Sequence, residues 1–136
     1  MLKQYEDSPT LLMVGNVEGA SAGVKHLLEM DGYRVVIAAT EQEAVESARR
    51  ECPDLLLVDL GLPPFDTVAI ARRIRRRARL SSGVPVVAFP VATAESEDTD
   101  ASLRHNVHVT YLIEFEQLET LLGHLLRAGV GYAIEA

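Results

Sequence analysis

The chain has 136 residues, of which 48% are hydrophobic and 24% charged, and its formal net charge is −7 at pH 7. These values are ordinary for a globular domain with a buried core, and the acidic balance argues against nucleic acid as a partner. No apolar run approaches the roughly 18 residues of a membrane-spanning helix, and residues 1–9 contain no apolar signal region. The single cysteine, Cys52, permits no internal disulfide. We therefore expect a one-domain, cytoplasmic protein with no membrane association.

Strands and helices alternate along the first part of the chain. Short apolar runs predict strands over 10–14 and 34–38, and apolar residues at helical spacing predict a helix over 20–30 between them. Gly32 follows this helix as its expected C-terminal cap. Residues 40–43, Thr-Glu-Gln-Glu, have the form of a capping box and predict the start of a second helix. This order of elements is typical of an α/β domain.

The stretch over 54–59 predicts the central strand. Four apolar residues run unbroken from Leu55 to Val58, as in strands that are buried on both faces of a parallel sheet. The run ends on a carboxylate, Asp59, and Gly61 begins a turn. Ligand chemistry in an open parallel sheet sits at the carboxyl ends of the strands, so Asp59 stands where a functional side chain would stand. The alternative is that Asp59 merely caps the turn.

The second half of the chain continues the alternation. The pattern predicts a helix over 66–79, a strand over 85–89 and another strand over 109–113. Residues 93–105 include few large apolar side chains, so we expect at most a short helix there. The final helix, over 116–127, has the clearest amphipathic pattern in the chain, because its leucines recur at i, i+3, i+4, i+7 and i+8.

The alternation of five strands with helices predicts the fold. It implies right-handed crossovers onto a parallel sheet with helices on both faces. We therefore expect a flavodoxin-like, doubly wound α/β domain with the strand order 2-1-3-4-5. The expected organisation is an N-terminal extension at 1–9, one domain at 10–128 and a C-terminal tail at 129–136, with Gly129 ending the final helix.

A run of arginines lies within the predicted 66–79 helix. Six of the thirteen basic residues are found there: Arg72, Arg73, Arg75, Arg76, Arg77 and Arg79. On a helix they cover most of the circumference outside the stripe that contains Ile74, so we interpret them as a solvated face. The alternative is an electropositive docking surface, for which the net charge favours an acidic protein partner over nucleic acid.

Two segments resemble those of one known family. Residues 53–63, with the sequence PDLLLVDLGLP, are similar to the phosphoacceptor strand and loop of response regulator receiver domains. Tyr111 and Leu112, ahead of the last helix, also match this family. The resemblance covers about residues 10–128. It implies that Asp59 is the residue phosphorylated by a histidine kinase, and that Tyr111 is the aromatic switch residue.

The rest of the family's site departs from its pattern. In the family, two acids bind Mg²⁺, a Ser or Thr binds the phosphoryl group, a Lys follows the fifth strand and a Gly stands in the phosphoacceptor loop. Those positions are occupied here by Gly15 and Asn16, by Pro90, by Glu114 and by Thr67, respectively. Of the five active-site positions, which are the two acids, the Ser or Thr, the Lys and the phosphoacceptor, Asp59 alone matches the family.

These departures predict a weak metal site. Mg²⁺ takes oxygen ligands in near-octahedral geometry and usually binds one or two carboxylates. The remaining weak candidates are Asp59, the amide oxygen of Asn16 and the carboxylate of Glu18. Glu114 would also repel a phosphoryl group with up to two negative charges. We therefore expect no bound metal and no cofactor.

The main functional hypothesis is an atypical receiver that is not an enzyme and signals by protein–protein interaction. Its partners would be a histidine kinase or a downstream effector. In the family the output face is formed by the fourth helix, the fifth strand and the fifth helix, which implies a face here containing the acidic segment 95–100, Tyr111 and the outer side of 116–127. On family grounds we also expect that a homodimer can form through this face.

Two other hypotheses stay open. The first is a conventional response regulator in which Asp59 is phosphorylated and Mg²⁺ is held by Asp59, Asn16 and Glu18. The second is a nucleotide-binding or catalytic flavodoxin-like protein, because Gly15 and Gly19 lie between a strand and a helix, where phosphate-binding loops occur. Ser21 stands at the third glycine position of that pattern, and no G-x-x-x-x-G-K-[ST] motif is present. The glycines are better explained by close packing of the first helix.

Overall fold

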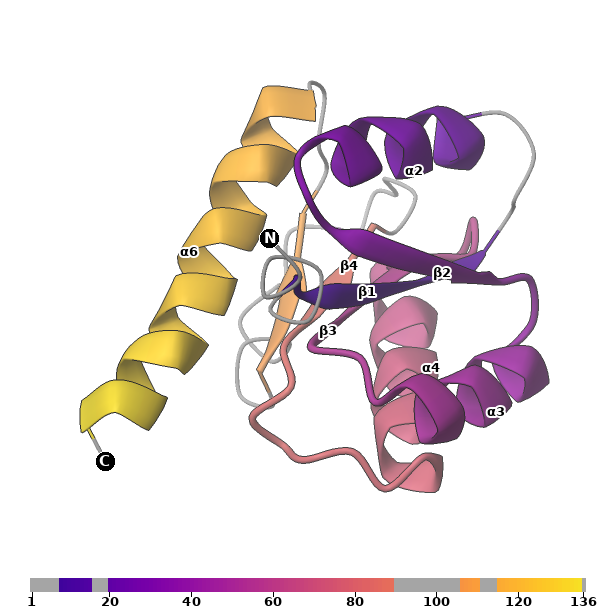
Figure 1. Ribbon diagram of the computed structural model, residues 1–136. Helices are drawn as coiled ribbons and strands as arrows, with labels where there is room; N and C mark the ends of the chain where they lie inside the picture. The colour runs from indigo at the N-terminus through magenta and orange to yellow at the C-terminus, as the bar shows by residue number, and fades with distance from the viewer. Residues whose placement is uncertain (1–7, 16–19, 90–105, 111–114, 136) are drawn as a thin grey trace.

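The computed structural model describes residues 8–15, 20–89, 106–110 and 115–135. Five parallel strands form one sheet in the order β2-β1-β3-β4-β5, with helices on both faces (Figure 1). The strands are β1 (Thr10–Gly15), β2 (Arg34–Ala38), β3 (Leu55–Asp59), β4 (Val86–Ala88) and β5 (Val107–Val109). The helices are α2 (Ala20–Met30), α3 (Glu41–Glu51), α4 (Pro64–Arg77) and α6 (Phe115–Glu135). The predicted flavodoxin-like strand order is confirmed.

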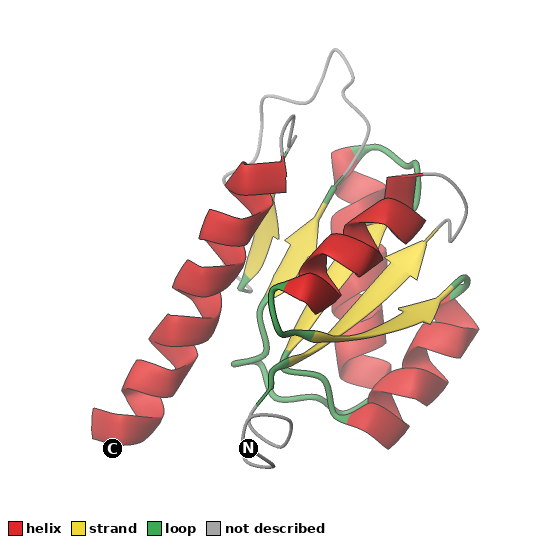
Figure 2. Cartoon of the chain, turned by 45° about the horizontal axis from the view of Figure 1, so that its top comes forward, coloured by secondary structure: helices red, strands yellow, loops and turns green. Residues whose placement is uncertain are grey.

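The strands divide the core into two layers because successive side chains point to opposite faces. Leu12, Val14 and their counterparts in β3 and β4 pack against α3 and α4. Leu11, Met13 and their counterparts pack against α2 and α6. Figure 2 shows the strands running in the same direction between these two helical layers. The unbroken apolar runs in the sequence are therefore explained by burial on both faces.

Local signals in the sequence produce the predicted starts and ends of two helices. The Thr40 side chain accepts a hydrogen bond from the Glu43 backbone N–H at 3.2 Å, and the Glu43 carboxylate accepts one from the Ala39 N–H at 3.2 Å. Thr40 is thus confirmed as the N-cap of α3, whereas the return bond of the predicted capping box goes to the N–H of the preceding residue, Ala39, and not to that of Thr40. Gly32, after α2, has a φ of +100° and donates its N–H to the Glu29 carbonyl oxygen, as expected for a C-terminal cap.

Several predicted boundaries were wrong. Helix α4 begins at Pro64 and not at Asp66, because proline is well tolerated in the first helical turn, where its missing N–H has no partner to lose. Strand β5 occupies Val107–Val109, earlier than the predicted 109–113. The final helix continues through Gly129 to Glu135, since an interior glycine weakens a helix by about 1 kcal/mol without ending it. The helix predicted within 93–105 lies outside the described residues.

No helix among the described residues is long and apolar enough to cross a membrane. The longest, α6, has 21 residues. Its first half contributes the buried Leu118 and Leu122 to the core layer shared with α2. The predicted amphipathic pattern of this helix is thus confirmed over the part that packs on the sheet.

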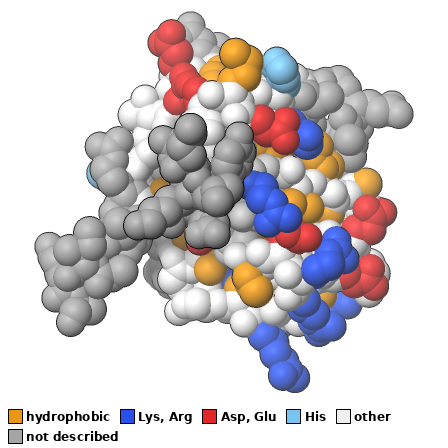
Figure 3. Space-filling model, viewed as in Figure 1, with side chains coloured by type: hydrophobic (Ala, Val, Ile, Leu, Met, Phe, Trp, Pro, Cys, Tyr) orange, Lys and Arg blue, Asp and Glu red, His pale blue; other side chains and the backbone are white. Residues whose placement is uncertain are grey.

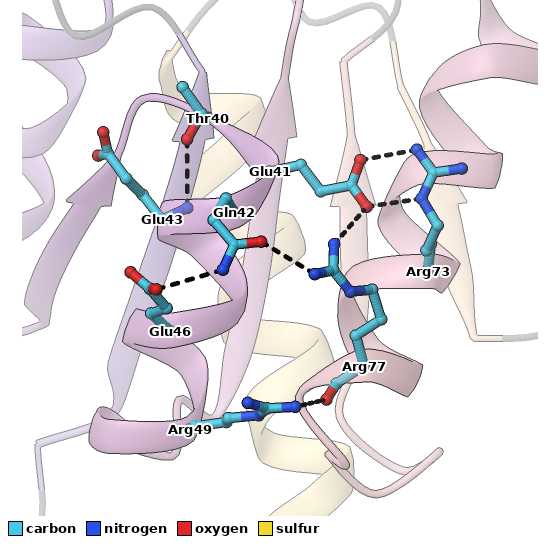
Figure 4. Close-up of polar contacts among 8 residues, drawn as sticks. All are labelled: Thr40, Glu41, Gln42, Glu43, Glu46, Arg49, Arg73 and Arg77. Atoms are coloured by element: carbon cyan, nitrogen blue, oxygen red, sulfur yellow. Dashed lines mark hydrogen bonds and ion pairs between the residues drawn. The ribbon is translucent and has the colours of Figure 1, made fainter.

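A network of charged side chains joins α3 to α4 (Figure 4). The Glu41 carboxylate accepts two hydrogen bonds from the Arg73 guanidinium, at 2.5 Å and 2.6 Å, in a bidentate geometry. Arg77 reaches the same carboxylate at 3.2 Å and donates to the Gln42 side-chain oxygen at 2.9 Å. Arg49 donates to the backbone oxygen of Arg77 at 2.9 Å. Glu41 therefore draws two of the arginines in the run toward α3.

The interpretation of all six arginines as a solvated face was wrong. Arg75 is buried, with 7% of its surface exposed, and its guanidinium donates to the backbone oxygens of Val84 at 2.9 Å and Asn106 at 3.4 Å. Burial, together with the charge of Arg72, lowers the pKa of Arg75. A long arginine can bury its aliphatic stem while its donors bind carbonyl oxygens, which the helical pattern could not reveal.

We predict that Glu41→Gln destabilises the fold by roughly 0.5–1 kcal/mol at pH 7, because both arginines lose their ionic partner in a partly exposed pair. The hydrogen bond from Arg73 is the main cause that lowers the pKa of Glu41 below its ordinary value of 4.5. A lowered folded-state pKa contributes stability that is complete above pH 4.5 and is lost as the pH falls through the folded-state pKa. Urea unfolding of the wild type and variant from pH 7 to pH 3 measures this difference.

Glu46→Gln is the matched control, because Glu46 is exposed and bonds only the neutral Gln42 side chain among the described residues. We expect its free energy of unfolding to stay within about 0.5 kcal/mol of wild type. An equal effect of the two substitutions at pH 7, or a Glu41→Gln difference that persists at low pH, would contradict the role given to the Glu41 carboxylate.

Candidate functional site

Asp59 is the last residue of β3 and lies at the carboxyl edge of the sheet. Strand β3 is central, with β1 on one side and β4 on the other. The Asp59 side chain is exposed, yet the surrounding protein removes part of its water and raises the pKa of the carboxyl above its ordinary value of 3.8. Among the described residues, no ion pair or hydrogen bond offsets this desolvation. The carboxylate is therefore available at the edge without a charged partner in the described part of the chain.

Gly15 faces Asp59 across the pair of strands. The two residues are partners in the β1–β3 register. Gly15 has a φ of +143°, and a Cβ atom added to it would lie 1.8 Å from the Asp59 backbone oxygen. Real Cβ atoms do not approach an oxygen so closely, and L side chains rarely adopt this φ. The strand geometry thus requires a glycine at one of the two positions where the family resemblance expects a metal-binding acid.

The described residues do not provide a magnesium-binding set. Within the described ranges, no group of three or more His, Cys, Asp and Glu side chains could hold a metal ion. Of the three weak candidates, Asp59 is at the edge, whereas Asn16 and Glu18 lie outside the described residues. Gly15 itself has no side-chain oxygen. The donor set expected for Mg²⁺, one or two carboxylates around the ion, is therefore represented here by Asp59.

Three other predicted positions, Pro90, Tyr111 and Glu114, lie outside the described residues. The strands that lead toward the first two end at the same edge as β3. The Phe89 N–H donates to the Val58 oxygen at 2.8 Å, and the Thr110 N–H donates to the Ala88 oxygen at 3.0 Å. Whether the Glu114 carboxylate faces Asp59 stays a prediction.

The loop after Asp59 is held by a residue whose role was missed in the sequence. Thr67 is fully buried, and its hydroxyl group contacts the backbone oxygens of Leu62 at 3.1 Å and Pro63 at 2.9 Å. Its N–H also donates to the Pro63 oxygen. Gly61 turns the chain with a φ of +70°. The only signal for Thr67 in the sequence was its place where the family has a glycine.

The family model of the response regulator receiver domain matches residues 11–119 of this chain. The chain belongs to the response regulator receiver domain family. Its fold, its sheet order and Asp59 at the end of β3 agree with this assignment. Receiver domains of this family act in two-component signalling.

Known proteins resemble this receiver domain in sequence and in structure. The transcriptional regulatory protein AfsQ1 of Streptomyces coelicolor is 30% identical over 92 residues, which are 68% of this chain and 38% of that protein. The match thus spans less than two fifths of that regulator. A CheY-like receiver domain from Methanospirillum hungatei superposes with a TM-score of 0.74 at 21% identity, covering 93% of this chain and 99% of that chain.

A third similar structure contains a metal. The receiver domain of the sensor histidine kinase PA1611 from Pseudomonas aeruginosa, solved with a magnesium ion coordinated in its active-site cleft, has a TM-score of 0.65 and is 27% identical. The match covers 88% of this chain and 98% of that chain. The same fold can therefore hold a magnesium ion in another receiver domain.

We predict that Gly15→Ala destabilises this receiver domain by at least about 2 kcal/mol, because the added methyl group would collide with the Asp59 carbonyl and require a strained φ. Gly23→Ala is the matched control: this glycine lies in α2, and an added Cβ would meet no atom within 4 Å. We expect the control to be neutral or stabilised by up to about 1 kcal/mol. Thermal and urea unfolding of both variants test this, and a harmless Gly15→Ala would contradict the close approach.

We predict that Asp59→Asn slightly stabilises the domain at pH 7, by no more than about 0.5 kcal/mol. Burial raises the folded-state pKa of Asp59, so the unfolded chain loses this proton at a lower pH than the folded chain. Stability therefore falls as the pH rises from 3.8 through the folded-state pKa, and the neutral amide removes that loss. Unfolding curves at pH 3.5 and pH 7 measure it. A destabilised amide variant at pH 7 would show that the ionised carboxylate has a stabilising partner.

Proposed function

We propose that this protein is an atypical receiver that signals through protein contacts, without Mg²⁺-dependent phosphorylation of Asp59. The observation that carries this proposal is the contact between Gly15 and the Asp59 backbone oxygen, which leaves no room for a side chain. An acid at this position cannot be restored by mutation without moving one of the two central strands. Two features therefore oppose metal binding at this position: the residue has no side-chain ligand, and the Asp59 backbone oxygen occupies the space that a side chain would need.

Electrostatics supports the same proposal. A phosphoryl group would add up to two negative charges to a carboxyl that is already partly desolvated. Without a metal or a lysine, nothing identified at the edge would neutralise them. A unit charge pair at about 4 Å is worth roughly 4 kcal/mol at an effective dielectric of 20, and Glu114 in place of the family's lysine would reverse the sign of that interaction. The aspartyl phosphate would then form slowly and decay readily.

The second candidate function is a conventional phospho-accepting response regulator. It is favoured by Asp59 itself, which keeps the family's phosphoacceptor position at the end of β3. In this case Asn16 and Glu18 would complete a magnesium site with Asp59. The regulators and the magnesium-bound receiver domain that this chain resembles are consistent with it.

The proposed partners are a histidine kinase or a downstream effector protein. We place their contact on the face formed around residues 95–100, Tyr111 and the outer side of α6, where a homodimer would also form. In a receiver without a phosphorylation switch, partner binding alone would shift the population between conformations. Nucleic acid is not expected as a direct partner of this acidic domain.

The decisive experiment measures binding of beryllofluoride, a phosphoryl mimic, in the presence of millimolar Mg²⁺. Backbone amide NMR signals of Gly61 and Ala88 report on the loop after Asp59 and on the end of β4. We expect these signals to stay unchanged in the wild type, because the metal needed to hold the mimic is not bound. A saturable, Mg²⁺-dependent shift that disappears in Asp59→Asn would overturn the proposal and establish the conventional switch.

The Glu114→Lys variant separates the two physical causes. If this variant responds to Mg²⁺ and beryllofluoride whereas the wild type does not, the negative charge of Glu114 is the main barrier. If neither responds, the departures at Gly15, Asn16 and Pro90 are sufficient to prevent binding of the mimic. Both outcomes support an atypical site, and each assigns it to different residues.

A further inference from the structure

The six arginines of the 72–79 run fall into two groups in the structure. Arg73 and Arg77 bind the Glu41 carboxylate, and the buried Arg75 binds backbone oxygens just before the starts of β4 and β5. These three arginines stabilise the domain itself. The others are Arg72, Arg76 and Arg79, which are exposed and form no ion pair with any acid in the described part of the chain.

Two of the exposed arginines share one side of α4. Arg76 lies four residues after Arg72, and at about 100° per residue the two fall within a narrow sector of the helix. Arg79 lies two residues past the helix end at Arg77, and its φ of +59° takes it out of the helical repeat. Ala69 and Phe65 extend the sector of Arg72 and Arg76 toward the helix start, and both are exposed. We call the row of Phe65, Ala69, Arg72 and Arg76, together with Arg79 just beyond the helix end, the arginine stripe.

Phe65 is the most exposed large apolar side chain in the described part of the chain, with 83% of its surface accessible. Single exposed apolar residues are common, but this one continues a row of arginines that have no acidic partner among the described residues. An aromatic side chain beside arginines is the composition enriched at the energetic centres of protein interfaces. Arg76 follows Phe65 by eleven positions, which is about 16 Å along the helix axis.

Interactions within the helix account for only part of this arrangement. Cations near a helix C-terminus are favoured by the helix dipole, which explains Arg76 and Arg79. The same dipole does not explain Arg72 in the middle of α4, whose charge lowers the pKa of Arg75. Like charges four residues apart also disfavour a helix, as for Arg72 and Arg76. Figure 3 shows Lys and Arg side chains gathered at the lower right, where Figure 1 places α3 and α4.

We propose that the arginine stripe docks an acidic helical segment of a partner protein, with its carboxylates opposite Arg72 and Arg76 and an apolar side chain against Phe65. Guanidinium groups bind carboxylates in a bidentate geometry, as Arg73 already does with Glu41. Glutamates four residues apart on a partner helix would match the spacing of Arg72 and Arg76. A protein segment is favoured over nucleic acid because the rest of this chain is acidic.

Binding at the arginine stripe can be tested separately from the proposed function. It does not depend on whether Asp59 is phosphorylated or whether Mg²⁺ binds. The stripe also lies on α4, whereas the described part of the proposed output face, α6, packs on the opposite face of the sheet. The two proposals can therefore fail independently. Asp59→Asn should leave binding at the stripe unchanged.

The test uses fluorescence anisotropy with a labelled synthetic peptide of about 16 residues, long enough for the 16 Å row with a turn to spare. The peptide is a helix with glutamates four residues apart and one leucine at the end that faces Phe65. We expect binding that weakens with added salt. Arg72→Glu/Arg76→Glu should weaken it at least about tenfold, and Phe65→Ser several-fold. A peptide with glutamine in place of glutamate should not bind.

The matched control is Arg34→Glu/Arg50→Glu, which changes the net charge equally at exposed arginines that pair with Glu51. Circular dichroism and thermal unfolding verify that every variant folds. If the control variant weakens peptide binding equally, net charge alone explains the effect and the proposal is overturned. Absence of peptide binding, or tighter binding of a duplex DNA of similar length that requires Arg72 and Arg76, would also overturn it.

Discussion

The domain depends on the burial of β3 on both of its faces. Leu55 and Leu57 enter the core layer shared with α2 and α6, whereas Leu56 and Val58 enter the layer of α3 and α4. The strand is hydrogen-bonded to β1 on one side and β4 on the other. An unpaired polar side chain is costly to bury within such a strand. The first polar residue after the apolar run, Asp59, therefore stands where the strand leaves the core. The position of the candidate site follows from the same burial that holds the sheet together.

In the proposed function, the close approach of β1 to β3 at this edge limits the chemistry that Asp59 performs. A carboxylate becomes a phosphoacceptor in the presence of a metal and cations that neutralise the added charge. Here the neighbouring strand ends in a glycine whose missing Cβ makes room for the Asp59 carbonyl. Backbone packing and metal ligation compete for the same space, and in this structure the space is taken by backbone. The chain thereby keeps the fold of the family and its phosphoacceptor position, Asp59, while Gly15 stands where the family resemblance expects a metal-binding acid.

The arginines of α4 differ in the groups that their side chains bind. Glu41, at the start of α3, is close enough to bind Arg73 and Arg77, which ties the two helices of one core layer together. Arg75 reaches inward to the backbone oxygens of Val84 and Asn106, which lie just before β4 and β5. What is left over is positive charge on the outward side of the helix, in a chain whose net charge is negative. This contrast distinguishes the arginine stripe from an ordinary mixed surface.

The sequence by itself determined the element types, the strand order and the place of Asp59, because apolar periodicity, capping residues and turn residues act over short distances along the chain. It also determined which side-chain types stand at the family's site, and hence that Gly15 offers no side-chain ligand to a metal. Only the tertiary structure decided why Gly15 must be a glycine, since the Asp59 carbonyl that excludes a side chain comes from a strand 44 residues away. The arginines also fall into those that pair with Glu41, the buried Arg75, and exposed ones with no acidic partner among the described residues. This division likewise depended on contacts with α3 and with the residues before β4 and β5. Helical periodicity places a residue on a face, but the partners that face it come from distant parts of the chain.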